Sequence, residues 1–294
     1  MSDARDGRGE RGERDGVRAV RRGKVWLVGA GPGDPELLTV RAHRLVARAE
    51  VLAYDELVSP EVLAIAPRYA ERIPVGRRAG GCRHHEARIH PLVVVRALEG
   101  KQVVRLKGGD PMIFGRGGEE ADELAAARVP FEFVPGISAA LGAAASTGIP
   151  LTHRDHASSV TFATAHAKLD GELSLDTSIP PGGTAVFYMG LGRLEATCEA
   201  LVRGGRSPTT PAAVISRATL PDERVVVGTL GDLAELVCAA NLPAPALLVV
   251  GDVVAQRVVS PEVTVAAAAA EETGEHGAKG GHPGASASQP RRLG

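Results

Sequence analysis

The stretch VWLVGAGPGDP at residues 25–35 decides the fold, because an apolar strand leads directly into a glycine-rich turn and then into a helix. We predict a strand at 25–28 and a helix from about 36 to 49, with Asp34 as its N-cap and Pro35 at its first position. Glycines in such a turn let the backbone approach a ligand closely, although an ordinary tight turn also uses them. A nicotinamide oxidoreductase is disfavoured, since Asp34 stands where the third glycine of a dinucleotide-binding turn belongs.

Strand and helix patterns continue to alternate after this turn, as far as residue 147. Strands that are followed by helices at this spacing predict an α/β domain whose sheet is largely parallel. The strands are expected at 51–54, 102–106 and 131–134, and the helices at 89–98, 117–127 and 138–147.

The pattern changes after Gly148-Ile149-Pro150, where strands outnumber helices. Fewer helices per strand predict a mixed sheet with antiparallel pairs. We therefore expect two α/β domains, at 24–137 and 138–260, with a ligand site between them. In the second domain the strands are expected at 160–163, 185–188, 213–215, 224–227 and 247–250, and the helices at 194–203 and 233–240.

Residues 1–23 and 261–294 are predicted to be disordered extensions. The first segment mixes seven arginines with five acidic residues and five glycines, and the second contains an alanine run followed by glycine, serine, proline and charged residues. Neither composition supports the burial of an apolar face. Because only 23 residues precede the first strand, we expect no further catalytic module on that side.

The composition excludes several classes of function. The net charge of the 294 residues is −1 and aromatic residues make up 3%, so nothing indicates binding to nucleic acid or to an anionic membrane. The apolar runs are strand-sized and the start lacks a signal-peptide pattern, so we expect a cytoplasmic protein without a transmembrane helix. Cys82, Cys198 and Cys238 lie far apart, and we expect reduced thiols.

A second glycine-rich loop follows the expected strand at 102–106. It has the sequence KGGDP at 107–111 and continues into FGRGGEE at 114–120, so it repeats the order strand, glycines, Asp-Pro, helix. The carboxyl ends of parallel strands meet at one edge of a sheet, and we expect the two loops to form opposing walls of one pocket. Asp110 is expected to accept a hydrogen bond from a ribose or an amino group, with capping of the next helix as the alternative.

These two loops, together with Leu37-Leu38-Thr39, resemble the tetrapyrrole methylase family. The resemblance covers residues 24–257 and implies two α/β domains with the cofactor in the cleft between them, and a homodimer. It also implies S-adenosyl-L-methionine as methyl donor and C-methylation of uroporphyrinogen III, in two transfers that give precorrin-2 for sirohaem or cobalamin biosynthesis. The segments most similar to the members that methylate uroporphyrinogen III are 54–59, 103–120, 134–137, 148–155 and 187–190.

The resemblance also implies roles for individual residues. Asp55 matches the general base of the family, Arg77 matches the proton donor, and Arg116 matches an arginine that handles the substrate. The family usually has lysine at the position of Arg77, and because arginine stays protonated we expect Arg77 to bind an anion instead. The positions that match contacts to S-adenosyl-L-methionine are Pro32, Gly108, Gly109, Asp110, Ile113, Ser138, Ala139, Met189 and Ala218.

Three further departures from the family pattern stand out. Ser138 replaces threonine and keeps the hydroxyl group, and Ala218 stands where glycine is usual. The segment CRHHEARIH at 82–90 is the largest departure, and since its three histidines do not fall on one helical face we expect no metal site. A tetrapyrrole with many carboxylates needs several guanidinium groups to bind it. The further candidates for that task are Arg78, Arg154 and Arg217.

Two other functions stay open at this point. One keeps the chemistry and changes the substrate to a different precorrin, which the unusual segment at 82–90 motivates. The other is a non-catalytic protein that binds an adenosyl ligand, which the retained Asp55 and the arginines disfavour.

Overall fold

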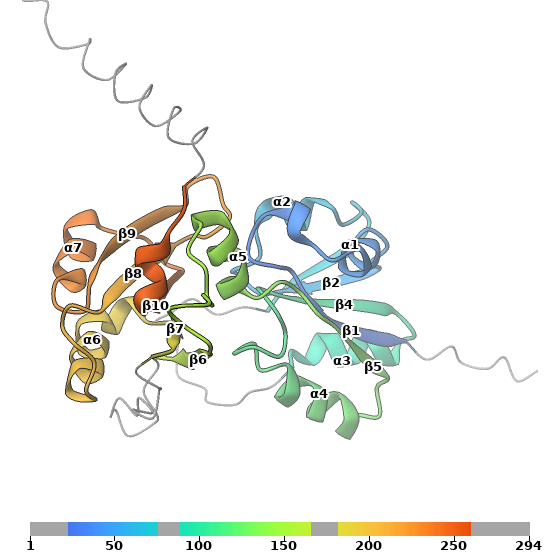
Figure 1. Cartoon of the computed structure of the whole chain (residues 1–294). Helices are drawn as coiled ribbons and strands as arrows, with labels where there is room; N and C mark the ends of the chain where they lie inside the picture. Colours follow the sequence, from blue (N-terminus) through green and yellow to red (C-terminus); the bar gives the residue numbers. More distant parts are fainter. Residues whose placement is uncertain (1–22, 76–88, 166–181, 260–294) are drawn as a thin grey trace, which may run out of the picture.

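The computed structural model describes residues 23–75, 89–165 and 182–259, which form two five-stranded sheets (Figure 1). The first sheet has the order β3-β2-β4-β1-β5, and its neighbouring strands are all parallel, which confirms the prediction of a parallel sheet. Its strands are β1 (Lys24–Gly29), β2 (Val51–Tyr54), β3 (Glu71–Pro74), β4 (Gln102–Lys107) and β5 (Phe131–Val134).

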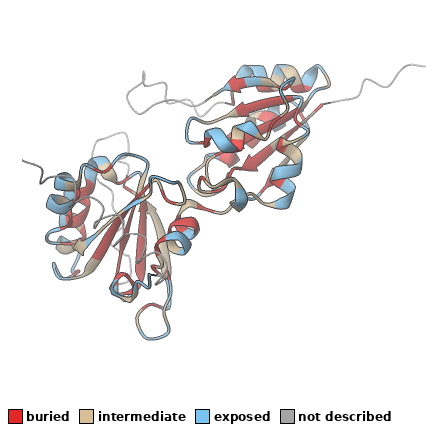
Figure 2. Cartoon of the chain, turned by 90° about the horizontal axis from the view of Figure 1, so that it is seen from above, coloured by how far each residue is buried: buried red, intermediate tan, exposed pale blue. Residues whose placement is uncertain are grey.

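Helices cover both faces of the first sheet. One face packs against α3 and α4, with Leu27, Val93 and Leu124 fully buried between them. The other face packs against α1 and α2 through Val46 and Val62. Figure 2 shows the result, with buried strands inside and exposed outer faces on the helices. The helices of this half are η1 (Pro35–Leu37), α1 (Val40–Val46), α2 (Pro60–Ala64), α3 (Pro91–Leu98) and α4 (Gly117–Ala126).

The prediction of one helix from about 36 to 49 is wrong. A 3-10 turn, η1, and a separate helix, α1, occupy this stretch, because Leu38 and Thr39 both have extended backbone. Thr39 starts α1 as its N-cap, and its hydroxyl accepts the Ala42 amide at 3.2 Å. Asp34 is an N-cap as predicted, but of η1, where its Oδ1 accepts the Glu36 amide at 2.8 Å.

The second sheet is mixed, as its pattern predicts. Its order is β6-β7-β10-β8-β9, with β6 and β7 parallel and the other pairs antiparallel. The strands are β6 (Val160–Thr164), β7 (Thr184–Tyr188), β8 (Pro211–Ser216), β9 (Arg224–Thr229) and β10 (Ala246–Val250). The helical segments are η2 (Leu191–Arg193), α6 (Leu194–Arg203), α7 (Leu233–Ala240) and η3 (Asp252–Gln256). No helix in the described segments is long and apolar enough to cross a bilayer.

Helix α5 (Ala139–Thr147) lies between the two sheets in the view of Figure 1. Its Ala140 and Ala143 share a buried cluster with Val186 of β7 and Ala213 of β8. The opposite face of the second sheet packs against α6 and α7. Because α5 shares its core with the second sheet, we propose that the domain boundary lies between β5 and α5, near the division expected from the sequence.

Candidate functional site

The two glycine-rich loops are joined by backbone hydrogen bonds. The amide of Gly109 donates to the carbonyl oxygen of Gly31 at 2.8 Å, and the amide of Gly31 donates to the carbonyl oxygen of Gly109 at 3.2 Å. The expectation of two opposing walls is therefore wrong, and the loops lie side by side. The reason is that β1 and β4 are neighbouring parallel strands, so the chain leaves the sheet at adjacent points.

A third turn, after β5, packs directly onto this pair of loops. A Cβ atom at Gly136 would lie 2.3 Å from the carbonyl oxygen of Gly109 and 2.8 Å from Cα of Gly29, so only glycine fits there. Asp110 stabilises the arrangement, since its Oδ2 accepts the Gly136 amide at 3.1 Å and its Oδ1 accepts the Met112 amide at 2.8 Å. An ionised carboxylate can accept more than two hydrogen bonds, so Asp110 can also accept from a ligand.

The N-terminus of α5 lies beside the second glycine loop. A Cβ atom at Gly109 would lie 3.5 Å from the amide nitrogen of Ala139. Ser138 is the N-cap residue, but its side chain makes no capping bond; its hydroxyl oxygen lies 2.5 Å from that of Tyr188 instead. The Tyr188 hydroxyl also accepts the Ala140 amide at 3.3 Å. The first turn of α5 is thereby tied to the end of β7.

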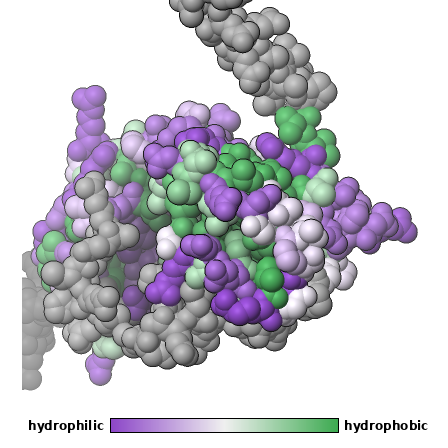
Figure 3. All heavy atoms as spheres, turned by 90° about the vertical axis from the view of Figure 1, so that its left-hand side faces the viewer, coloured by the Kyte–Doolittle hydropathy of each residue, from purple (hydrophilic) through white to green (hydrophobic). Residues whose placement is uncertain are grey.

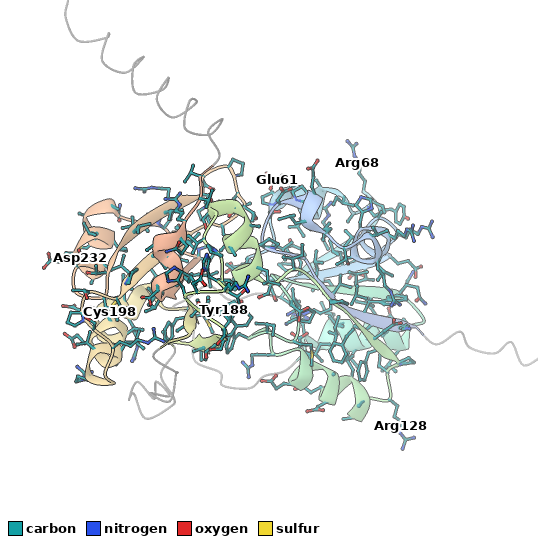
Figure 4. All side chains as sticks on the ribbon, viewed as in Figure 1. Glu61, Arg68, Arg128, Tyr188, Cys198 and Asp232 are labelled. Carbon is teal, nitrogen blue, oxygen red and sulfur yellow. The ribbon has the colours of Figure 1, made fainter. Side chains whose placement is uncertain are left out.

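Tyr188 connects the two halves of the molecule through its ring as well. The ring centroid lies 4.9 Å from that of Phe114, in the loop after β4, and 6.0 Å from that of Phe162 in β6. Figure 4 shows the Tyr188 side chain in the region between the sheets. Tyr188 is not among the residues predicted for the site. Its hydroxyl-bearing ring at the end of a buried strand, directly before Met189, is the signal that marks it.

Residues with positive φ gather around this region. Phe114 has φ of 52° and Arg116 of 57°, both in the loop after β4, and Met189 has φ of 57° directly after β7. Arg217 and Thr219, in the loop after β8, have φ of 52° and 68°. Such backbone is costly for residues other than glycine, most of all for a β-branched threonine, and it persists where the surrounding structure imposes it. Met189 is also 53% exposed.

The loop after β8 packs on the first glycine loop. The hydroxyl of Thr219 accepts the Asp34 amide at 3.2 Å, and Glu223 in turn accepts the Thr219 amide at 2.7 Å. A Cβ atom at Gly33 would lie 2.8 Å from Cδ2 of Leu220, so the contact is close. These contacts bring together the loops that carry two positions expected to bind the cofactor, one from each sheet. The two positions are Pro32 and the buried Ala218.

Asp55 lies at the carboxyl end of β2 in contact with basic side chains of β4. Its Oδ1 lies 2.6 Å from Nη2 of Arg105, and its Oδ2 lies 3.8 Å from Nζ of Lys107. Glu120 of α4 lies 2.7 Å from both of these cations. Arg105, Lys107 and Glu120 were not predicted as site residues. The signal that could have found the two cations is a pair of basic residues at alternate positions of a strand whose other residues, after Gln102, are apolar.

Three of the five arginines expected to bind the substrate lie within the described residues. Arg116 is exposed, and its Nε lies 3.3 Å from a carboxylate oxygen of Glu119. Arg154 is exposed, and Arg217 is half-buried in an ion pair with Asp222 that holds the pKa of this carboxyl below its usual value. The two remaining candidates, Arg77 and Arg78, lie outside the described residues.

The segment at 82–90 is described only at its end. Cys82, His84 and His85 lie outside the described residues. His90 caps α3, with its Nδ1 accepting the Leu92 amide at 3.3 Å. In the part of the chain that the structure describes, no three His, Cys, Asp or Glu side chains gather as metal ligands do.

The model of the family of Tetrapyrrole (Corrin/Porphyrin) Methylases matches residues 24–234. The chain belongs to the tetrapyrrole methylase family. The match begins at β1 and extends to α7, so both glycine loops, the first turn of α5 and Asp55 lie within the part that resembles other tetrapyrrole methylases.

Individual relatives agree with this assignment. The siroheme synthase of Pseudomonas aeruginosa (strain UCBPP-PA14) is 54% identical over 244 residues, which are 82% of this chain and 52% of the relative. The chain thus spans about half the length of the curated relatives that it matches. A solved uroporphyrin-III C-methyltransferase from Thermus thermophilus, in complex with S-adenyl homocysteine, is 41% identical with a TM-score of 0.68, covering 79% of this chain and 93% of that one. A solved cobalt precorrin-4 methyltransferase of cobalamin biosynthesis is 28% identical with a TM-score of 0.69, covering 79% and 95%.

Proposed function

We propose that the chain catalyses C-methylation of uroporphyrinogen III with S-adenosyl-L-methionine as methyl donor. Two transfers would give precorrin-2 for sirohaem or cobalamin biosynthesis. The observation that carries the proposal is the similarity to the Thermus thermophilus C-methyltransferase, which is 41% identical, is matched over 93% of its length and holds the demethylated cofactor. The matched region is long enough to include the loops of both sheets.

The residues at the site fit S-adenosyl-L-methionine. Gly109 has φ of +65°, and a side chain there would project toward the amides at the start of α5. Amides at a helix N-terminus bind carboxylates such as that of a methionine group. Asp110 and the hydroxyl of Ser138 suit the amino and ribose groups, and the exposed thioether of Met189 suits a sulfonium or an adenine ring. We propose that Pro32, Gly108, Gly109, Asp110, Ile113, Ser138, Ala139, Met189 and Ala218 hold the cofactor.

The cofactor supplies an electrophilic methyl group when it is bound. The task of the protein is to hold a pyrrole carbon in line with that group and to accept the proton that the carbon loses. Asp55 suits the second task, because its carboxylate stands at the carboxyl end of β2 with 27% of its side chain exposed. Arg105 fixes the orientation of this carboxylate through the ion pair at Oδ1. We propose Asp55 as the base.

The arginines are the residues that we expect to bind the substrate. Arg116 stands two residues after Phe114, whose ring packs against that of Tyr188. The guanidinium of Arg116 is exposed and so able to pair with a carboxylate. Arg154 and Arg217 offer further positive charge. We propose that Arg77 holds a substrate carboxylate rather than donating a proton, since a guanidinium does not release a proton near neutral pH.

The test is to incubate the pure protein with uroporphyrinogen III and methyl-labelled S-adenosyl-L-methionine, and to analyse the tetrapyrrole by mass. We expect a product that carries two labelled methyl groups, together with S-adenosyl-L-homocysteine. An unlabelled tetrapyrrole would refute the activity. Calorimetry that showed binding of a nicotinamide dinucleotide and none of S-adenosyl-L-homocysteine would refute the cofactor.

A methyltransferase for another precorrin is the second candidate. It is favoured by the similarity to the cobalt precorrin-4 methyltransferase and by the departure from the family pattern at 82–90. The same assay with a precorrin as acceptor separates the two candidates. Label in that precorrin, and none in uroporphyrinogen III, would favour the second.

We further propose that the chain forms a homodimer in the cytoplasm. Val227 of β9 and Leu236 of α7 are 44% and 41% exposed. Figure 3 shows the face that carries α6 and α7, where hydrophobic residues lie among hydrophilic ones. A homodimer is also what the resemblance to the tetrapyrrole methylase family implies. Light scattering would give the mass of a single chain if the dimer is wrong, and cell fractionation tests the location.

A further inference from the structure

Four ionisable side chains form one cluster at the carboxyl edge of the first sheet. Arg105 and Lys107 occupy alternate positions of β4 and so project from the same face of the sheet. Glu120 contacts them from α4, and Asp55 from the end of β2. Arg105, Lys107 and Glu120 are buried, whereas 27% of the Asp55 side chain is exposed. Asp55 is thus the member of the cluster that a substrate can reach.

Glu120 binds both cations through a single oxygen. Its Oε1 lies 2.7 Å from Nη2 of Arg105 and 2.7 Å from Nζ of Lys107. Its Oε2 is buried and has no hydrogen-bond partner within the described ranges. A buried ion cluster with an unsatisfied oxygen stabilises a fold poorly, because the loss of hydration offsets the attraction between the charges. Fold stability alone therefore does not account for the arrangement.

Glu120 and Asp55 compete for the ammonium group of Lys107, and the distances show that Glu120 binds it more closely. Nζ of Lys107 lies 3.8 Å from Oδ2 of Asp55, which is beyond hydrogen-bonding distance, whereas Oδ1 of Asp55 lies 2.6 Å from Arg105. Among the residues that the structure describes, a cation binds Asp55 closely at one oxygen only. The second cation is kept at a distance because Glu120 attracts it.

We propose that Glu120 is a positioning residue for methyl transfer, which holds Lys107 so that Oδ2 of Asp55 stays available to accept a proton. The inference rests on the proposed function, in which Asp55 is the base. Without the charge of Glu120, the remaining carboxylate of the cluster is Asp55. A shift of roughly 1 Å would then bring the ammonium group of Lys107 to hydrogen-bonding distance from it. A carboxylate bound by cations at both oxygens accepts a proton less readily.

The first variant is Glu120→Gln, which keeps the shape of the side chain and removes its charge. We expect kcat at saturating concentrations of both substrates to fall by about tenfold or more. The KM for uroporphyrinogen III and the Kd for S-adenosyl-L-homocysteine should stay within about twofold, since no contact to either ligand is removed. The melting temperature is measured in parallel, so that loss of folding is seen separately from loss of turnover.

The matched variant is Glu120→Gln combined with Lys107→Met, which also removes the cation that Glu120 restrains. We expect this double variant to recover most of the turnover that Glu120→Gln loses. A purely structural role for Glu120 predicts instead that the double variant is no faster than the single one and that activity follows the melting temperature.

The outcomes are separable. Wild-type turnover in Glu120→Gln, or a double variant no faster than Glu120→Gln, would overturn the inference. If Glu120→Gln does not fold, the double variant is tested alone, because the charges of Arg105 and Asp55 in its cluster still balance. Turnover of the double variant within about tenfold of wild type would then support the inference. A folded double variant without turnover would contradict it. A wild-type protein that methylates no tetrapyrrole would refute the proposed function instead.

Discussion

The two sheets contribute to the site in different ways. The first sheet provides charge, because Asp55 follows β2 and the cations Arg105 and Lys107 lie at the end of β4. The second sheet provides turns with constrained backbone, at Met189 after β7 and at Thr219 after β8. β7 and β8 both run antiparallel to β10 and are therefore parallel to each other, so their carboxyl ends lie at the same edge. Both sheets thus have carboxyl ends of strands at the edge that carries the site. All five strands of the first sheet end at that edge, and fewer strands of the second sheet do.

This difference suggests a division of labour. Buried charges at the first edge suit proton transfer, since their positions are fixed by hydrogen bonds and ion pairs before a substrate arrives. Constrained turns at the second edge suit binding, a task that they share with the glycine loops of the first sheet, since they hold side chains such as Met189 where a ligand can contact them.

The largest effect on stability is expected from Gly136→Ala, at the edge of the first sheet. A Cβ atom there would collide with backbone atoms of both neighbouring loops, at 2.3 Å from the carbonyl oxygen of Gly109. Overpacking of this kind costs about 1–3 kcal/mol or more, so the melting temperature should fall and S-adenosyl-L-homocysteine binding should be lost. Gly118→Ala is the control, since a Cβ atom there meets nothing within 4 Å. Differential scanning calorimetry that gave both variants the same melting temperature would contradict the close packing of the loops.

A smaller effect is expected from Thr219→Val, in the second half. Valine keeps the β-branched shape but no longer accepts the Asp34 amide, which is 3.2 Å from the hydroxyl in the native protein. A lost hydrogen bond costs about 0.5–1.5 kcal/mol, or a factor of about 2–10 in affinity. We expect the affinity for S-adenosyl-L-homocysteine to fall by this factor, and kcat to change little. Thr229→Val, at the far end of β9, is the control. A change in kcat without a change in Kd would break the division of labour.

The smallest functional effect is expected from the buried thiol of the second half. Cys198 lies on α6 (Figure 4). It is 3% exposed, and burial raises its pKa to about 11. Only on the order of one thiol in a thousand is then ionised at pH 8, and the thiolate is the reactive form. In a Cys82→Ser background, the exposed Cys238 should react quickly with a thiol reagent and Cys198 only as the protein unfolds or as the pH approaches its pKa. Two equally fast thiols would show that the core under α6 opens readily.

Local signals in the sequence predicted most of the fold. The strands of both sheets lie where apolar runs predicted them, apart from β3, and the change from parallel to mixed pairing followed from the number of helices per strand. The helix expected at 36–49 failed because Thr39 caps a new helix inside the apolar pattern. The short α2 was missed although Ser59 and Pro60 form a typical helix start.

The site could be predicted only in part, because its assembly depends on contacts between distant segments. The sequence singled out the glycine loops and Asp110 as candidates, but the direct pairing of the two loops follows from the order of the strands in the sheet, which no local pattern contains. Tyr188 and Thr219 were not found, since a hydroxyl 50 residues from Ser138 and another 185 residues from Asp34 become partners only in the folded chain. The roles of Asp55 and the other expected site residues remain proposals.

The division of labour is tested most directly by a single-turnover assay of Asp55→Asn, loaded with labelled S-adenosyl-L-methionine and mixed with uroporphyrinogen III. Asparagine keeps the shape of Asp55 and removes its ability to accept a proton. We expect a Kd for S-adenosyl-L-homocysteine within about twofold of wild type, and a rate of methyl transfer lower by about 10²–10⁴-fold, as for the loss of a positioned base. Transfer at the wild-type rate would show that Asp55 is not the base, because its charge at the edge of the first sheet would then have no part in the chemistry.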